Sequence, residues 1–170
     1  MRAPYRGDRT TCRGITIEGV PPMIDVGTVR VFRPDPSAAE SPQQRGRAVF
    51  SIRSLPPTLS VVTAVGEIDA TNGRDLGRYV ECHTASATQL IVDLTGVTFF
   101  GSQGFSALHY MSVSCTRIDV DWVIVPGGEV RRLLRICDPQ GELPLADSVD
   151  AACARLDRVT RRRQPFSWAG

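Results

Sequence analysis

The sequence predicts an α/β protein with a mixed, mostly parallel sheet of about five strands and about four flanking helices. After Ala48, short segments rich in β-branched residues alternate with segments whose apolar residues recur at helical spacing. Strands that alternate with helices favour parallel pairing, because each helix returns the chain to the same end of the sheet. Only the first two strands follow each other directly, so one antiparallel hairpin is expected at the start.

Turn and capping residues set the limits of the individual elements. Pro56-Pro57 marks the turn of the hairpin, and Pro126-Gly127-Gly128 ends the fourth strand. A polar side chain can cap a following apolar stripe at three places, which are Thr71 or Asn72, Ser102, and Asp147 or Ser148. The predicted strands are residues 48–55, 59–68, 89–94, 120–125 and 143–145. The predicted helices are residues 71–86, 102–117, 129–136 and 147–159.

Three segments of the chain differ in composition. Residues 1–47 are a Pro-rich extension that is expected to be poorly ordered, residues 48–157 are the folded domain, and residues 158–170 are a basic tail. The domain holds eight Arg against thirteen acidic residues, a net charge of −5, which argues against nucleic acid as the main partner. No apolar run approaches the roughly 18 residues of a membrane helix, and no signal peptide is recognisable. We therefore expect a cytoplasmic protein without a membrane partner.

The five cysteines and two histidines show no spacing typical of a metal site. The cysteine count is odd and no pair has C-x-x-C spacing, so no disulfide framework is indicated either. No metal or cofactor is expected. No acid–base pair converges on one segment, so the chain is not expected to be an enzyme.

The segment from Leu90 to Phe105 carries the most information about function. An apolar strand leads into a turn, and Ser102 stands where a helix begins, among unpaired N–H groups at the positive end of the helix dipole. A nucleophile elbow requires G-x-S-x-G, and Phe100 occupies the position of the first glycine. A P-loop requires a lysine, and the chain has none. Two roles remain for Ser102, a helix N-cap or a phosphorylated serine.

Three short motifs in this frame resemble the STAS family, the anti-sigma factor antagonist domain of bacterial regulators and of sulfate transporter C-termini. They are Gly66-Glu67-Ile68-Asp69, Asp93-Leu94-Thr95-Gly96-Val97 and Ser102-x-Gly104. The resemblance covers about residues 48–157 and implies a STAS-type mixed sheet. It also implies an antagonist that binds an anti-sigma factor with serine-kinase activity and so releases a sigma factor. In such antagonists the kinase phosphorylates the helix-opening serine, here Ser102, and a metal-dependent serine phosphatase restores it.

One departure from the family pattern lies beside this serine. The family has Asp immediately before the serine and often a second Ser after it, whereas this chain has Gly101 and Gln103. The missing carboxylate removes a group that could orient the Ser102 hydroxyl or contact the kinase. The glycine also loosens the turn, because it has more conformational freedom to lose on folding.

The predicted partner-binding surface is the rim of the sheet that carries the serine turn. It comprises Asp69, Asp93, Gly101, Ser102, Gln103, Gly104 and Phe105. The two aspartates stand near predicted strand ends and are expected on the same rim as Ser102, although turn hydrogen bonding is an equally open role for them. The alternative function is a STAS sensor or scaffold that is never phosphorylated and binds a small molecule or a transporter partner.

Overall fold

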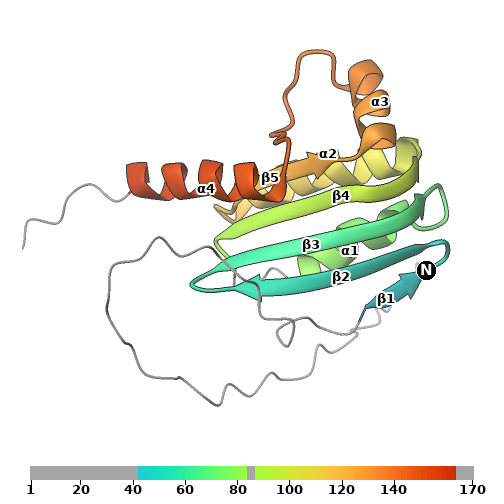
Figure 1. Ribbon diagram of the computed structural model, residues 1–170. Coiled ribbons are helices and arrows are strands. Elements are labelled where there is room, and N and C mark those ends of the chain that lie inside the picture. Colours follow the sequence, from blue (N-terminus) through green and yellow to red (C-terminus); the bar gives the residue numbers. More distant parts are fainter. Residues whose placement is uncertain (1–41, 84–86, 164–170) are drawn as a thin grey trace, which may run out of the picture. The chain divides into compact units, whose positions relative to one another are not determined.

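A five-stranded mixed sheet forms the centre of this computed structural model, which describes residues 42–83 and 87–163 (Figure 1). The strands follow each other in the order β1-β2-β3-β4-β5. Pairing is antiparallel from β1 to β3 and parallel from β3 to β5. The strands are β1 Gln43–Arg45, β2 Ala48–Leu55, β3 Leu59–Ile68, β4 Gln89–Phe100 and β5 Asp121–Pro126. The predicted mixed sheet is confirmed, with β4 in an interior position.

Four helices connect and cover these strands in the described part of the chain. They are α1 Gly73–His83, α2 Ser102–Arg117, α3 Gly128–Cys137 and α4 Val149–Arg163. Each lies where an apolar stripe predicted a helix. None of them is long and apolar enough to cross a membrane.

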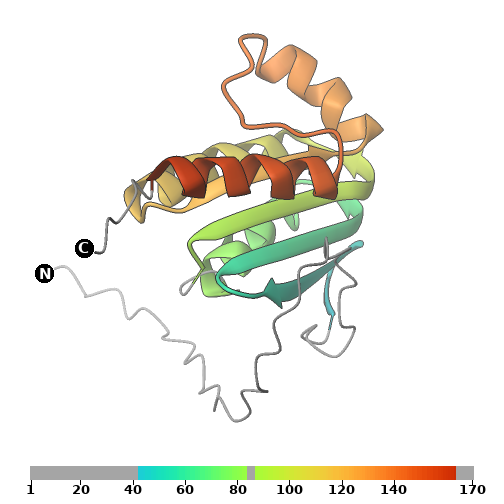
Figure 2. The same ribbon diagram turned by 60° about the vertical axis from the view of Figure 1, so that its left-hand side comes forward.

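The sheet separates two hydrophobic cores of unequal size. The larger core lies between the sheet and α1, α2 and α3, and contains Phe50, Leu76, Leu90 and Leu108, all fully buried. The smaller core lies on the other face, where α4 covers β4 and β5 (Figure 2). Strand alternation produces this division, because Leu90 faces one core and its neighbour Ile91 faces the other.

Strand β4 is twice as long as the sequence predicted. It continues past residue 94 to Phe100, because β3 pairs with it as far as Ile68, through two register shifts near Gly66. Gly66 has a φ of +103°, and a side chain there would collide with the backbone carbonyl of Arg47. The predicted turn after Leu94 is therefore extended backbone.

The ends of the domain also differ from the predicted boundaries. Strand β1 comes from the segment assigned to the extension, and the rest of that segment, residues 1–41, lies outside the described residues. At the other end, α4 continues to Arg163, whose guanidinium contacts Asp119 and Asp121 at 3.1 and 3.2 Å. This ion pairing anchors residues that were predicted to begin the basic tail. The predicted strand at 143–145 is a single bridge, between Leu145 and Ile124.

Candidate partner-binding site

Helix α2 begins at an exposed turn without a side-chain cap. Its N-cap residue is Gly101, in extended conformation, and no side chain accepts a hydrogen bond from the first turn. The Gly101 carbonyl accepts from the N–H groups of Gly104 and Phe105, at 3.0 and 3.3 Å. Among the described residues, the N–H groups of Ser102 and Gln103 have no acceptor. This helix end therefore has unused donors at the positive end of its dipole.

Ser102 is the first helical residue and not the cap. Its side chain is exposed, and within the described residues its hydroxyl makes no hydrogen bond. The purely structural role as an N-cap that the sequence left open is therefore wrong, because the capping position belongs to Gly101. Nothing in the described fold requires the hydroxyl, which leaves it accessible to a partner.

Helix α1 begins beside this turn, in a hydrogen-bonded loop. Asn72 is buried, accepts from the Asp69 N–H at 2.9 Å, and donates to the carbonyls of Arg45 and Glu67 at 3.1 and 2.8 Å. The Asp69 carboxylate accepts from the Thr71 N–H and hydroxyl, at 2.8 and 2.6 Å. The Thr71 hydroxyl is the main reason that the pKa of Asp69 is lowered, because it stabilises the carboxylate.

The two helix starts contact each other directly. The Gly101 N–H donates to the Ile68 carbonyl at 2.8 Å, which joins the end of β3 to the α2 turn. A Cβ atom on Gly73 would lie 2.7 Å from the Gln103 Cβ, so glycine is required for this close approach. Asp69 and Ser102 therefore belong to one rim, as predicted.

Asp93 does not belong to that rim. It pairs in register with Thr63 and Val125 in the middle of the sheet, and its carboxylate accepts from the Thr95 N–H and hydroxyl at 3.0 and 2.7 Å. Six residues of strand β4 lie between Asp93 and Phe100, which places their Cα atoms about 20 Å apart. The expected position at a strand end was wrong because β4 continues past Leu94. The turn-type hydrogen bonding predicted as its alternative role is what the structure shows.

The remaining predicted residues divide between surface and core. Gln103 is half-buried against Gly73, and Gly104 is buried against the Phe100 ring. A Cβ on Gly104 would lie 2.5 Å from a Phe100 ring carbon, so this glycine allows the helix to sit close to the strand. Phe105 packs against the larger core. Gly104 and Phe105 therefore position the turn, and Ser102 is its most accessible side chain.

Phe99 is an exposed residue of this rim that the sequence reasoning missed. Its side chain is 49% exposed, and its ring lies 3.4 Å from the position of a Cβ on Gly101. In a strand, neighbouring side chains face opposite sides, and Phe100 packs in the larger core whereas Phe99 stays exposed on the other side of the sheet. The sequence shows the Phe99-Phe100 pair, but the alternation of their side chains can be inferred only when β4 is known to extend to Phe100. The Arg47–Glu67 ion pair, at 2.9 Å, lies on the neighbouring strand end.

Two observations on the described residues concern catalysis at this site, the separation of Ser102 from His109 and the lack of a metal-type cluster. His109 lies seven residues after Ser102 on α2, about 10 Å along the helix axis. Its ring contacts the edge of Phe105, with centroids 6.5 Å apart. No three His, Cys, Asp or Glu side chains of the described part are grouped so as to hold a metal ion.

Comparison with known proteins agrees with this architecture. The family model described as STAS domain matches residues 52–152. Osmosensory protein A of Mycobacterium tuberculosis is 34% identical over 111 residues, which cover 62% of this chain and 70% of that protein. An anti-sigma factor antagonist from Mycobacterium paratuberculosis superposes with a TM-score of 0.54 at 22% identity, covering 78% of this chain and all of that one. Unphosphorylated SpoIIAA, also an anti-sigma factor antagonist, gives 0.51 at 16% identity, covering 69% and 99%.

The chain belongs to the STAS domain family. The matched residues contain all of β3, α1, β4, α2, β5 and α3, and therefore the whole serine turn. At these levels of identity the two solved structures establish the fold.

Proposed function

We propose that this protein is an anti-sigma factor antagonist that acts by protein–protein binding in the cytoplasm. It binds an anti-sigma factor with serine-kinase activity through the rim formed by Asp69, Phe99 and Gly101–Gln103, and thereby releases a sigma factor. Phosphorylation of Ser102 ends the interaction, and a serine phosphatase reverses it.

The observation that carries this proposal is the unengaged hydroxyl of Ser102. It is exposed at a helix N-terminus where the N–H groups of Ser102 and Gln103 lack acceptors in the described structure. A phosphate there would be stabilised by these donors and by the helix dipole. It would also add a charge of about −1.5 to −2 to an acidic domain, which disfavours an acidic partner surface. Two anti-sigma factor antagonists share this fold.

The test is incubation of the full chain with each anti-sigma factor kinase of the same genome and ATP, followed by mass spectrometry of the peptide that contains Ser102. Wild type should gain one phosphate on Ser102, and Ser102→Ala none. Ser102→Ala should bind the anti-sigma factor like wild type, whereas Ser102→Glu should bind it more weakly. If no anti-sigma factor binds the unmodified chain in titration calorimetry, the proposal is wrong.

The second candidate function is a STAS sensor or scaffold that is not phosphorylated. Gly101 favours it, because the carboxylate that the family places before the serine is missing. The name of the similar Mycobacterium tuberculosis protein, osmosensory protein A, also points towards sensing. Tight binding of an anti-sigma factor without any phosphate transfer to Ser102 would favour this function.

A further inference from the structure

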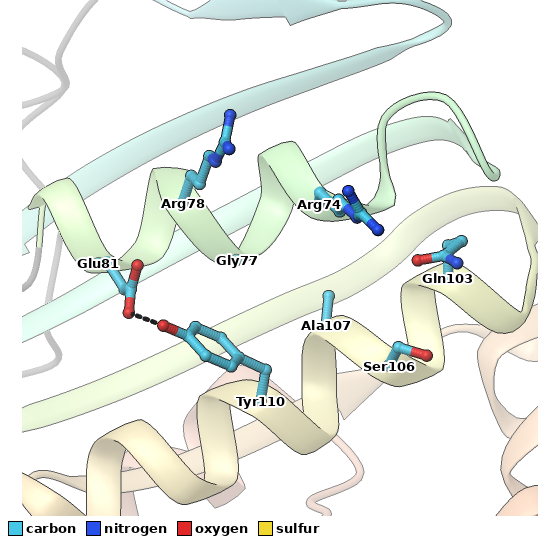
Figure 3. Close-up of a pocket in the computed structure, with 8 residues that line it drawn as sticks. All are labelled: Arg74, Gly77, Arg78, Glu81, Gln103, Ser106, Ala107 and Tyr110. Atoms are coloured by element: carbon cyan, nitrogen blue, oxygen red, sulfur yellow. Dashed lines mark hydrogen bonds between the residues drawn. The ribbon is translucent and has the colours of Figure 1, made fainter. Parts of the chain in front are cut away.

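A groove of about 390 Å³ runs between α1 and α2, starting beside the serine turn (Figure 3). Small residues form its floor, Gly77 from α1 and Ala107 from α2. Gln103, the neighbour of Ser102, lies at one end. The hydrogen bond from the Tyr110 hydroxyl to Glu81, at 2.6 Å, closes the other end. The groove is therefore continuous with the rim that we propose as the partner-binding site.

The α1 wall of the groove carries two arginines that have no acidic partner among the described residues. Arg74 and Arg78 are exposed and one helical turn apart. Within the described residues, no carboxylate lies within ion-pair distance of either guanidinium. The two arginines place two positive charges on one wall of the groove, in a domain whose net charge is −5.

In the described structure Glu81 makes no ion pair with either arginine. It is the one carboxylate among the groove-lining residues, and it accepts the hydrogen bond from Tyr110. The groove therefore presents two guanidinium groups, unpaired within the described part of the chain, beside a floor of small residues. Guanidinium groups bind carboxylates in a bidentate manner, which gives them both strength and directional preference.

We propose that this groove docks an acidic segment of the anti-sigma factor, whose carboxylates pair with Arg74 and Arg78. The inference rests on the proposed function and names the part of the partner that the chain recognises. The groove runs along α1 and α2, and side chains of both helices line it. Its occupant therefore lies along the two helices, as a polypeptide segment can. The same partner then covers the groove and the Ser102 turn together.

The position of the groove also explains how a phosphate on Ser102 would act. Gly73 contacts Gln103, so Arg74 and Ser102 each stand one residue from the contact between the two helix starts. A phosphate on Ser102 would repel the acidic segment and compete with it for the nearer arginine. Phosphorylation would then weaken binding without any change of fold.

The first test measures binding of a short fluorescein-labelled peptide of alternating Glu and Leu, with a Gln–Leu peptide as control, by fluorescence anisotropy on the full chain. Wild type should bind the Glu peptide at least about tenfold more tightly than the Gln peptide, and the difference should shrink at high salt. The double variant R74E/R78E should lose this preference. Equal binding of the two peptides by wild type, or unchanged binding by R74E/R78E, would overturn the proposal.

Matched variants separate a local effect from a general one. R158E/R161E makes the same charge change on two exposed arginines of α4, on the other face of the sheet, and should bind within about twofold of wild type. Gly77→Leu fills the floor without changing charge and should weaken binding. A Cβ at Gly77 meets only Tyr110, at an ordinary 3.7 Å, so the melting of Gly77→Ala shows whether helix α1 accepts a side chain at this position. Circular dichroism and melting of each variant establish that it is folded.

The same variants, tested on the anti-sigma factor that binds wild type, distinguish the two proposals. If the anti-sigma factor binds wild type and R74E/R78E equally, the groove proposal fails while the proposed function stands. If no anti-sigma factor binds but the peptide preference depends on Arg74 and Arg78, the proposed function fails and the acidic docking site stands. Analytical sedimentation of the chain alone tests whether a second copy occupies the groove. If wild type is a dimer and R74E/R78E is a monomer, the groove binds a second copy of this chain and the proposal is wrong.

Discussion

The starts of α1 and α2 lie side by side on one rim, and they are built in opposite ways. At α1, buried Asn72 and the Asp69 carboxylate take up the loop's donors and acceptors through five hydrogen bonds. At α2, glycine is the cap, no acidic residue stands in the first turn, and the Ser102 hydroxyl is unengaged in the described structure. The difference separates a helix start held by side-chain hydrogen bonds from one whose polar groups are unengaged in the described structure.

Asn72→Ala should produce the largest effect, because it removes the centre of the α1 network. Three hydrogen bonds disappear and buried backbone groups lose their partners, which should cost about 3 kcal/mol of the free energy of unfolding. Chemical denaturation measures this loss. Gln44→Ala removes one exposed hydrogen bond beside the same hairpin and should cost less than about 0.5 kcal/mol. Similar losses for both variants would show that water replaces the Asn72 amide.

Gly73→Ala tests the contact between the two helix starts. A Cβ there would lie 2.7 to 2.8 Å from Gln103 atoms, including a backbone carbon, so the helices must move apart at a cost of about 1–3 kcal/mol. Gly77→Ala on the same helix should instead stabilise by about 0.5–1 kcal/mol, since it gains helix propensity without a clash. Thermal melting should show a lower melting temperature than wild type for Gly73→Ala and a higher one for Gly77→Ala. Stabilisation by both substitutions would mean that the contact at Gly73 is not tight.

Gly101→Asp should make the α2 start resemble the α1 start. The backbone of Gly101 is extended, and a Cβ there would make ordinary van der Waals contacts at 3.4 to 3.7 Å, so the position accepts a side chain. A carboxylate there can cap α2 and interact favourably with its dipole. We expect the free energy of unfolding, measured by chemical denaturation, to rise by about 0.5 kcal/mol. Repulsion from the neighbouring Asp69 carboxylate limits this gain. Gly101→Ala adds the Cβ without the carboxylate and should be less stable than wild type. If the Ala variant is as stable as the Asp variant, the gain comes from the backbone and not from a cap.

Thr71→Val tests the electrostatics of the α1 loop. Without the hydroxyl, the main cause that lowers the pKa of Asp69 is gone, so this pKa should rise towards its usual value while the Thr71 N–H bond keeps part of the shift. NMR titration of the Asp69 carboxyl measures it. Because the folded-state pKa is lowered, the stabilisation exists above the unfolded pKa and disappears as pH falls through the folded pKa. If the pKa of Asp69 does not change, the backbone N–H of Thr71, and not its hydroxyl, causes the lowered pKa.

Ser102→Ala should have the smallest effect on stability. The hydroxyl caps nothing, so the free energy of unfolding should stay within about 0.5 kcal/mol of wild type. Denaturation curves of both proteins check this. A larger loss would reveal a structural role for the hydroxyl, and changes of binding in this variant could no longer be attributed to the partner surface.

The sequence alone determined the elements whose signals are local. The hairpin strands 48–55 and 59–68 and the helix 102–117 have the predicted bounds, because a Pro-Pro turn and a helical apolar stripe are each read within a few residues. The order and spacing of three short motifs were enough to identify the STAS family. They also placed Asp69 and Ser102 on one rim, since both follow the carboxyl ends of parallel strands.

Only the tertiary structure decided where distant segments meet. Strand β4 extends to Phe100 because β3 pairs with it over that length. As a result, Asp93 lies within the sheet and Phe99 lies at the rim. Pairing with β2 likewise draws Gln43–Arg45 into the sheet. The groove beside Arg74 lies between α1 and α2, where Gly73 and Gly77 of α1 face side chains of α2. Strand register and helix packing depend on residues far apart in the chain. The hydrophobic patterns of a sequence, in contrast, involve only residues close to each other in the chain.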